Sequence, residues 1–281
     1  MIAIGPADRR YPQGLLDLRD PPDPLWIEGD PATLARRSVS IVGTRRMTPY
    51  GARVARELAS ACASAGLVVV SGLAQGVDSA AHEGALATGT TVAVLGAGIA
   101  AHLGEAPGRR RRLAHAVRQA GALISEFPPD APARPWTFVR RDATIAALGL
   151  ATVVVEAPAG SGALITAAEA RKLRRPLYAV PGPIGSSASV GANELIARHA
   201  ASALTGAPML LAALGIAAAT LAGADRDDDA RVLDALAGSP SDPDALARQL
   251  GLSTAALAVI VARLLIQGRI GSAADGRLAR R

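Results

Sequence analysis

The sequence predicts an α/β fold, in which a doubly wound, Rossmann-like parallel sheet is followed by a small C-terminal winged-helix domain. From residue 38 onward, short β-branched apolar runs alternate with Ala-rich segments of helical spacing. Such continuous apolar strands are typical of a parallel sheet that is covered by helices on both faces. Toward the C terminus, the alternation gives way to short helical segments and a tail punctuated by glycines.

The main domain is expected to span residues 38–210 and to consist of strands that alternate with helices. The expected strands are Val39–Val42, Leu67–Val70, Thr91–Leu95, Ala122–Ile124, Thr152–Val155 and Leu177–Val180. The expected helices are Tyr50–Ala65, Ala80–Thr88, Arg110–Ala120 and Leu164–Leu173. Because ligands of such sheets bind beyond the carboxyl ends of the strands, the turns that follow the strands are the candidate site.

The segments on either side of this domain differ from it in composition. Residues 1–37 carry closely spaced prolines that exclude a long helix, so they are expected to pack on the main domain as an appendage. Within this appendage, Trp26 and Ile27 are expected to form a short edge strand. Residues 211–228, which are rich in Ala, Gly and Leu and end in an acidic run, are expected to be a linker.

The winged-helix module is expected to cover residues 229–281. Its first helices are expected at Ala230–Ala237 and Pro243–Leu250, and its hairpin wing within Gln267–Arg281. The helix between them has apolar residues at the spacing of one helical face, namely Leu257, Ile260, Val261, Leu264 and Leu265. Its exposed positions are mainly Ala255, Ala256, Ala258 and Ala262, with Arg263 as the one good donor. Contact with protein, or autoregulation, is therefore favoured over reading of bases.

Composition limits the classes of function that the chain can serve. Of its 281 residues only 2% are aromatic, and the whole net charge of +6 arises within residues 1–224. A basic balance suits a polyanionic partner. The sequence has no apolar run long enough to span a membrane and no leader-like N terminus, so a soluble cytoplasmic protein is expected. The single Cys62 excludes an intrachain disulfide and a cysteine metal cluster, and neither a metal nor a cofactor is expected.

The turn after the first strand of the main domain has the composition of an anion site. Gly43 and Thr44 lead from the strand into a helix that begins near Thr48, and free backbone N–H groups at a helix start attract anions. Arg45 and Arg46 add forked donors that suit phosphate. A strand–helix turn with solvated arginines is the alternative interpretation.

Turns after the second and fifth strands have similar chemistry. After the second strand, a hydroxyl group and two glycines would permit close approach of a phosphate or a ribose. After the fifth strand, a Gly/Ser-rich turn again leads into a helix start. The candidate residues in these turns are Ser71, Gly72, Gly76, Ser161, Gly162 and Thr166. Gly96-Ala97-Gly98 lacks the third glycine of a dinucleotide fingerprint and the chain has no Walker lysine motif, so neither NAD nor ATP is well supported.

Further side chains have both a structural and a functional interpretation. Asp78 and His82 are one helical turn apart, and a structural clasp between them is favoured over acid–base catalysis. A run of basic residues is either a solvated helix start or a basic funnel for nucleic acid; it comprises Arg109, Arg110, Arg111 and Arg112. Phe138 stands beside Arg140 and Arg141, a grouping suited to a stacked base and its phosphates, although a core role for Phe138 is the alternative.

Together these motifs resemble the DNA processing protein A family, also called Smf. The resemblance rests on Val42-Gly43-Thr44-Arg45 with Tyr50-Gly51, on SGLAQGVDSAAHEGAL from Ser71, and on LISEFP, SGALITAAEA, AVPGPIG and GANELI in the same order. It implies a non-enzymatic, homodimeric protein that binds single-stranded DNA, protects incoming DNA and helps to load the RecA recombinase in natural transformation. By motif, Arg45 would be the leading phosphate contact, Tyr50 part of the same site, and Phe138 the aromatic side chain beside the DNA.

The sequence departs from the family pattern in two places. After Phe138, the usual Arg-Asn-Arg stands here as Arg141-Asp142-Ala143, which loses one positive charge and adds a negative one. After the third strand, Ala100 and Leu103-Gly104 replace the usual Asp and Tyr-Pro, and the arginine run follows. These changes would shift the path of the DNA, and the run from Arg109 to Arg112 would supply the charge that is lost at Ala143.

An enzyme acting on nucleotides is the competing interpretation, because phosphoribohydrolases have a similar sheet and a PGGxGT loop followed by a glutamate. Pro158 to Gly162 imitates the start of that loop, but Ala163 replaces its threonine and Thr166 its glutamate. The remaining candidates for a general base are Glu126, Glu156 and Glu169. The lack of a base at the expected position argues against hydrolysis.

Overall fold

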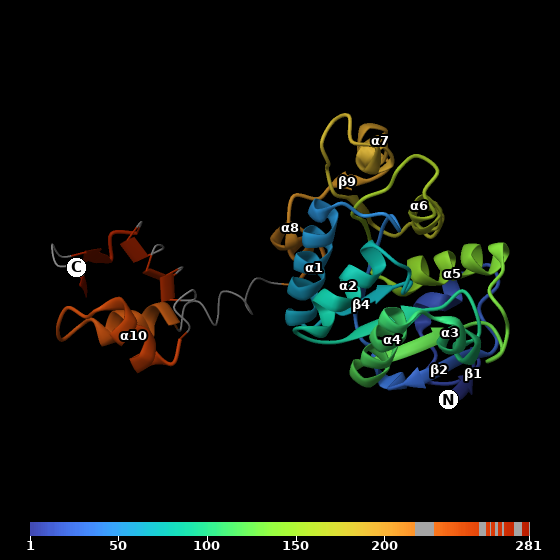
Figure 1. The fold of residues 1–281 in the computed structure, drawn as a ribbon, viewed down its shortest axis with the longest axis horizontal. Coiled ribbons are helices and arrows are strands. Elements are labelled where there is room, and N and C mark those ends of the chain that lie inside the picture. The colour runs from blue at the N-terminus through green and yellow to red at the C-terminus, as the bar shows by residue number, and fades with distance from the viewer. Residues whose placement is uncertain are drawn as a thin grey trace. The chain divides into compact units, whose positions relative to one another are not determined.

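The computed structural model describes residues 1–216, 228–252, 257–258, 260–261, 264–265, 267–272 and 277–280. The chain divides into two compact units, Met1–Gly215 and Ile216–Arg281, and each is described by itself (Figure 1). None of the helices in the described ranges is both long and apolar enough to cross a membrane.

The first unit is built on a nine-stranded sheet with the order β1-β2-β6-β5-β4-β3-β7-β8-β9. The strands are β1 (Ile2–Ile4), β2 (Leu25–Gly29), β3 (Ser38–Val42), β4 (Val68–Ser71), β5 (Thr91–Val94), β6 (Ala122–Ser125), β7 (Thr152–Val154), β8 (Leu177–Ala179) and β9 (Ser202–Ala203). All neighbours from β6 to β9 pair in parallel, whereas β1 and β2 add antiparallel pairs at one end. Every residue of β3 is buried, as expected for a central strand that is covered on both faces.

Helices cover both faces of this sheet. They are α1 (Pro49–Ser64), α2 (Val77–Leu86), α3 (Ile99–Glu105), α4 (Gly108–Ala120), α5 (Pro135–Leu148), α6 (Ala163–Lys172), α7 (Val190–Ala197) and α8 (Ala207–Ala213), with short 3-10 turns η1 (Gln13–Asp17), η2 (Pro31–Ala35) and η3 (Ser187–Ser189). Alternate residues of one strand enter different cores: Val92 and Val94 pack in a cluster with Ile145 of α5, and Ala93 packs in a cluster with Val117 of α4. The period-two alternation of a strand therefore separates the two layers.

The order of the strands places a switch point between β3 and β7. From β3 the chain adds β4, β5 and β6 successively on one side, and then returns to place β7 and β8 on the other side of β3. Connections of this kind are right-handed, so the return puts α5 and α6 on the face opposite α1 and α2. At such a point the loops after the neighbouring strands diverge and leave a crevice, where ligands of α/β proteins bind.

The N-terminal segment is part of the first unit. Trp26 and Ile27 lie in β2, as predicted, and pair with Ser125 and Ile124 of β6. The prediction of an edge position was wrong, because β1 pairs with the outer side of β2. The Tyr11 hydroxyl donates to the carbonyl oxygen of Pro22 at 2.8 Å, which holds the proline-rich segment on the domain.

The predicted linker, residues 211–228, begins inside a helix. α8 extends to Ala213, and its Leu210 and Leu211 are buried, so the boundary assumed at residue 210 falls too early. These apolar side chains belong to the first unit because leaving them in solvent would cost the free energy of their burial. Residues 217–227 of the expected linker lie outside the described residues.

The second unit contains the elements of the predicted winged helix. Residues 228–235 are helical, α10 covers Pro243–Leu250, and β10 (Ile270–Ser272) pairs with β11 (Leu278–Arg280) as an antiparallel hairpin. Leu257, Ile260 and Leu264 are buried in its core, as predicted, but Leu265 is 40% exposed because it lies at the border of the apolar face. Ala258 is exposed, whereas Ala255, Ala256, Ala262 and Arg263 lie outside the described residues.

A buried carboxylate fixes the turn between β3 and α1. Glu156 lies just after β7, which ends at Val154, and its side chain is buried, with 2% exposure. Its two oxygens accept hydrogen bonds from the backbone N–H and the hydroxyl of Thr48, at 2.8 and 2.5 Å, and Thr48 is the N-cap of α1. Gly51 has no room for a side chain, because a Cβ would lie 2.2 Å from a Glu156 oxygen. The Glu156 carboxylate thus joins the segment after β7 to the start of α1.

Substitution of Glu156 by alanine should destabilise the first unit by about 2 kcal/mol, since hydrogen bonds to a charged group are lost and the N-cap is left without support. Both tryptophans, Trp26 and Trp136, lie in this unit, so urea unfolding followed by tryptophan fluorescence measures the effect. The control is Glu57→Ala, which removes an exposed i,i+4 pair of α1 and should change stability by less than about 0.5 kcal/mol. Equal effects of the two substitutions would contradict the assigned role of Glu156.

Candidate functional site

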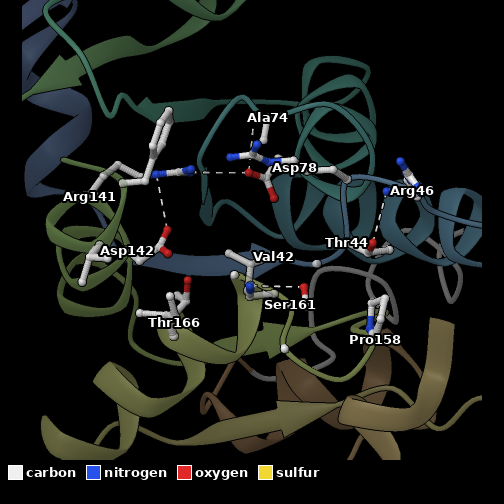
Figure 2. A pocket seen from close by; sticks show the side chains of 18 of the residues that line it. Val42, Thr44, Arg46, Ala74, Asp78, Arg141, Asp142, Pro158, Ser161 and Thr166 are labelled. Carbon is white, nitrogen blue, oxygen red and sulfur yellow. Dashed lines mark hydrogen bonds and ion pairs between the residues drawn. The ribbon is translucent and has the colours of Figure 1, made fainter. Parts of the chain in front are cut away.

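A cleft of about 500 Å³ opens at the carboxyl ends of β3 and β7, where the strand order places the switch point. We call it the switch-point cleft (Figure 2). Its walls come from the turn after β3, from the segment before α2, from the first turns of α5, and from the turn that leads into α6. The lining residues that the sequence had singled out are Gly43, Thr44, Arg45, Arg46, Asp78, Phe138, Arg141, Ser161, Gly162 and Thr166.

The turn after β3 is held rigidly by backbone hydrogen bonds. The Thr44 N–H donates to the Glu156 carbonyl at 2.7 Å, and the Thr44 carbonyl accepts from the Val77 N–H at 3.1 Å. Gly76 adopts φ +90°, and a Cβ there would lie 2.2 Å from the Thr44 carbonyl oxygen. Gly76 therefore serves to lock two loops together and does not line the switch-point cleft.

This rigid turn presents two exposed guanidinium groups. The side chain of Arg45 lies over the ring of Phe138, with 5.4 Å between the guanidinium carbon and the ring centroid. Arg46 also lines the switch-point cleft, and its backbone N–H donates to the Thr44 hydroxyl at 3.1 Å. A cation and an aromatic face, held side by side on short elements, form a surface that suits a phosphate next to a planar group.

Arg141 is a buried charge in the wall of the switch-point cleft, with only 5% exposure. Its guanidinium lies between two carboxylates, 3.5 Å from an oxygen of Asp78 and 3.3 Å from an oxygen of Asp142 (Figure 2). It also lies 5.8 Å from the centroid of the Phe138 ring. A buried guanidinium requires such partners, because an unpaired charge in this position would cost several kcal/mol.

Glycines after β4 and β5 make room for side chains of α5. A Cβ at Gly72 would lie 1.2 Å from a terminal nitrogen of Arg141, and one at Gly96 would lie 2.7 Å from the ring of Phe138. The open side of Gly72 is filled by Arg141, and Gly72 does not line the switch-point cleft. These glycines contribute to the site indirectly, because they allow Arg141 and Phe138 to reach the ends of the strands.

The two carboxylates have raised pKa values. Burial raises the pKa of Asp78, although the Arg141 guanidinium opposes the shift. Burial also raises the pKa of Asp142 to about 6, and the charge of Asp78 acts in the same direction, while Arg141 opposes it. The side chain of Thr166 also acts against the rise in the pKa of Asp142. The sequence revealed Asp142 as a departure from the family pattern, and its helical spacing from Phe138 would have placed it in this wall.

Two predicted roles near α2 were wrong. The hydroxyl of Ser71 is buried and donates to the carbonyl oxygen of Ile41 at 2.6 Å, so it faces the neighbouring strand and no ligand. His82 does not pair with Asp78; its Nδ1 lies 2.7 Å from the hydroxyl of Thr91. Burial lowers the pKa of His82 to about 3, so the ring is neutral at physiological pH. Although Asp78 and His82 are one helical turn apart, their side chains contact different residues, Arg141 and Thr91.

Arg140 and Tyr50 also point elsewhere. Arg140 forms ion pairs of 2.6 Å with Glu126, which follows β6, and with Asp20 of the N-terminal segment. The Tyr50 hydroxyl donates to the carbonyl oxygen of Pro181 at 2.9 Å, and the ring lies in a separate depression beside Arg53. Neither residue lines the switch-point cleft.

The arginine run at the start of α4 has mixed roles. Arg109 pairs with Glu83 at 2.9 Å, and Arg111 donates to the carbonyl oxygens of Gly104 and Ala106 at the end of α3. Arg112 is exposed. Arg110 lines two further hollows that Arg45 also lines, and Arg109 lines one of them, so both residues face the surroundings of the switch-point cleft. The predicted compensation for the charge lost at Ala143 stays a prediction.

The turn into α6 completes the switch-point cleft. Within this turn, the Ser161 N–H donates to the Pro158 carbonyl at 3.1 Å, and the Ser161 hydroxyl accepts from the Ala163 N–H at 3.4 Å. Gly160 adopts φ +73°, a conformation that favours glycine. Pro135, Val139 and Ile165 add apolar lining that the sequence did not single out. A polar turn and apolar side chains of α5 and α6 thus line the same cleft.

The glutamates considered for hydrolysis are engaged elsewhere. Glu126 pairs with Arg140, Glu156 accepts hydrogen bonds from Thr48, and Glu169 lies 2.7 Å from the ammonium of Lys172. None of the three is among the residues that line the switch-point cleft, where Asp78 and Asp142 are the carboxylates. The arrangement offers these glutamates no position from which to activate a water in the cleft.

Comparison with known proteins assigns the family. A family model described as DNA recombination-mediator protein A matches residues 3–215, which include the whole cleft. The chain belongs to this family. A second model, described as the DprA winged helix domain, matches residues 216–276.

Relatives and solved structures agree with this assignment. Protein Smf of Escherichia coli K12 is 41% identical over 199 residues, which cover 69% of this chain and 52% of that protein, so the chain spans about half the length of this relative. The X-ray structure of DNA processing protein A from Streptococcus pneumoniae has a TM-score of 0.70 at 32% identity. The match covers 75% of this chain and 73% of that one.

A structure of DNA processing protein A from Helicobacter pylori, described for its single-stranded DNA binding mode, has a TM-score of 0.67 at 28% identity. The match covers 76% of this chain and 94% of that one. Together with the family models, these likenesses confirm both the family resemblance and the predicted fold class, including the winged helix.

The raised pKa of Asp142 predicts how stability depends on pH. Because the folded-state pKa of about 6 exceeds the ordinary 3.8, protonation of Asp142 favours the folded state. This stabilisation is complete below pH 3.8 and is lost as the pH rises through about 6. The difference in unfolding free energy between the natural chain and Asp142→Asn should therefore change across this range, by at most about 1.4 kcal/mol per pH unit. Urea unfolding at a series of pH values measures it, and a constant difference would refute the assigned pKa.

Proposed function

We propose that this member of the DNA recombination-mediator family binds single-stranded DNA in the switch-point cleft. The observation that carries the proposal is the position of Arg45, whose exposed guanidinium lies over the ring of Phe138 at the switch point of the sheet. A guanidinium offers forked donors to a phosphate, and the ring offers a face to a base of the same strand.

The geometry favours a single strand over a duplex. In a single strand the bases are free to stack on a side chain while the phosphates contact neighbouring cations, whereas the bases of a duplex are stacked on one another. Phe138 lines a concave cleft and is half-buried, so a base must enter to reach it. Backbone phosphates would contact Arg45, Arg46 and the turn at Ser161, which carries no base-reading side chains. Binding should therefore show little preference for sequence.

The wider role follows from the family. We infer that the chain acts without catalysis, protects incoming DNA in the cytoplasm, and helps to load the RecA recombinase during natural transformation, as a homodimer. The family assignment supports mediation of recombination. The engagement of Glu126, Glu156 and Glu169 in structural contacts supports binding in place of nucleotide hydrolysis. The alanine-rich surface expected for the third helix of the second unit supports contact with protein.

Substitution of Arg45 by alanine should weaken binding of a labelled oligothymidylate at least about ten-fold, because a charge-assisted contact is worth about 1.5–3 kcal/mol. Fluorescence anisotropy over a range of salt concentrations measures this loss. For single strands, each phosphate contact contributes about −0.7 to the slope of log affinity against log salt, so the variant should lose about one such contribution.

Arg53→Ala is the matched control, because Arg53 is an exposed arginine that stacks on Tyr50 outside the switch-point cleft. It should leave the affinity and the salt slope nearly unchanged. A duplex of the same sequence should bind more weakly than the single strand. Equal losses in the two variants, or preference for the duplex, would contradict binding in the switch-point cleft.

A further inference from the structure

Asp142 places a carboxylate in the wall of a cleft that is proposed to bind an anion. The residue belongs to α5, lines the switch-point cleft and is 8% exposed. Figure 2 shows its carboxylate directed toward the guanidinium of Arg141, at 3.3 Å. A negative charge in this wall repels a phosphate in the cleft, so the protonation state of Asp142 bears on binding.

Charged groups from three elements surround this carboxylate. Arg141 of α5 pairs with it but also pairs with Asp78 of α2 at 3.5 Å, so one buried guanidinium is shared by two carboxylates. Arg45, from the turn after β3, acts on it as a second positive charge. Exposed Arg46 of the same turn completes the charged residues that line the cleft within the described part of the chain. Thr166 of α6 also lines it and carries no charge.

In the free protein, opposing effects set the protonation of Asp142. Burial raises its pKa to about 6, and the charge of Asp78 acts in the same direction. Arg141 and Arg45 oppose this rise. Asp142 is therefore mostly ionised at neutral pH, and Arg45 is one of the two positive charges that keep it so.

A phosphate bound to Arg45 would change the electrostatic surroundings of Asp142 in two ways. It would neutralise the positive charge that Arg45 offers to the carboxylate, and it would bring a negative charge into the same cleft. Both changes raise the pKa of Asp142 further, because a nearby like charge disfavours the ionised form. A group whose pKa is higher in the complex takes up a proton on binding, and the affinity then rises as the pH falls.

We propose that Asp142 is an affinity-determining residue of the switch-point cleft, where one proton moves from solvent to its carboxylate when a single strand binds. The proposal rests on the proposed function, because a backbone phosphate on Arg45 drives the uptake of the proton. It concerns this chain in particular, since Asp142 stands where the family pattern has an asparagine, which does not ionise. The aspartate makes binding depend on pH.

The first test measures the affinity of the full chain for a labelled oligothymidylate between about pH 5 and about pH 8, by fluorescence anisotropy at constant salt. Neither thymine nor the backbone phosphates change charge over this range. Asp142→Asn removes the titrating group and keeps the shape of the side chain. The matched control is Asp130→Asn, because Asp130 is an exposed aspartate that does not line the cleft.

Above about pH 6, the affinity of the natural chain should fall by up to about ten-fold per pH unit, since one proton is taken up. Asp142→Asn should lose this dependence. It should bind at least about five-fold more tightly than the natural chain at about pH 8, and within about two-fold of it at about pH 5. Asp130→Asn should follow the natural chain at every pH.

Calorimetric titration at about pH 7 gives a second readout, which a purely structural role of Asp142 would not change. Phosphate and Tris buffers differ in ionisation enthalpy, so the difference between the heats observed in the two buffers gives the number of protons taken up. The natural chain should take up about half a proton or more per strand, and Asp142→Asn close to none. Urea unfolding followed by tryptophan fluorescence checks that each variant is folded.

The results that would overturn the proposal differ from those that would overturn the proposed function. Binding of single strands by the natural chain without uptake of a proton refutes the role of Asp142 and needs no variant. The same pH dependence in the natural chain and in Asp142→Asn also refutes it, as does tighter binding of the variant by one constant factor at every pH. If the natural chain binds no single-stranded DNA at any pH, the proposed function fails as well.

Discussion

The buried ion pairs of Arg141 are the constraint on which the site depends. Arg141 comes from α5 on one face of the sheet and reaches Asp78 at the start of α2 on the other, across the carboxyl ends of the central strands. It can do so only because Gly72 has no side chain. Phe138 lies one turn before Arg141 in α5, and its ring packs against Gly96. The Arg45 guanidinium lies over this ring. A structural charge thereby positions the residues that face the solvent.

The charged side chains of the site form two groups, one buried in the wall of the cleft and one exposed at its surface. In the buried wall, the Arg141 guanidinium faces Asp78 and Asp142. The raised pKa values of these two groups reflect the cost of burying two carboxylates around one cation. At the surface, Arg45 and Arg46 are exposed and available to an external anion. The negative charge that this chain introduces at Asp142 thus pairs with Arg141, and in the proposed function the exposed arginines contact the phosphates.

The sequence allowed the sheet, its glycine-rich turns and the position of Arg45 at the end of a central strand to be predicted, because strand patterns and switch-point rules concern the order of elements. It did not reveal the partners of individual side chains. Ser71, His82 and Arg140 had suitable chemistry and spacing, but their hydrogen bonds run to Ile41, Thr91 and Glu126, which only the folded chain brings near.

The position of a bound strand tests the account most directly. A crystal structure of the full chain with a short oligothymidylate should show a phosphate between Arg45 and the turn at Ser161, with a base against the ring of Phe138. A strand bound instead along the depression beside Tyr50 and Arg53, or only to the second unit, with the switch-point cleft empty, would contradict the account.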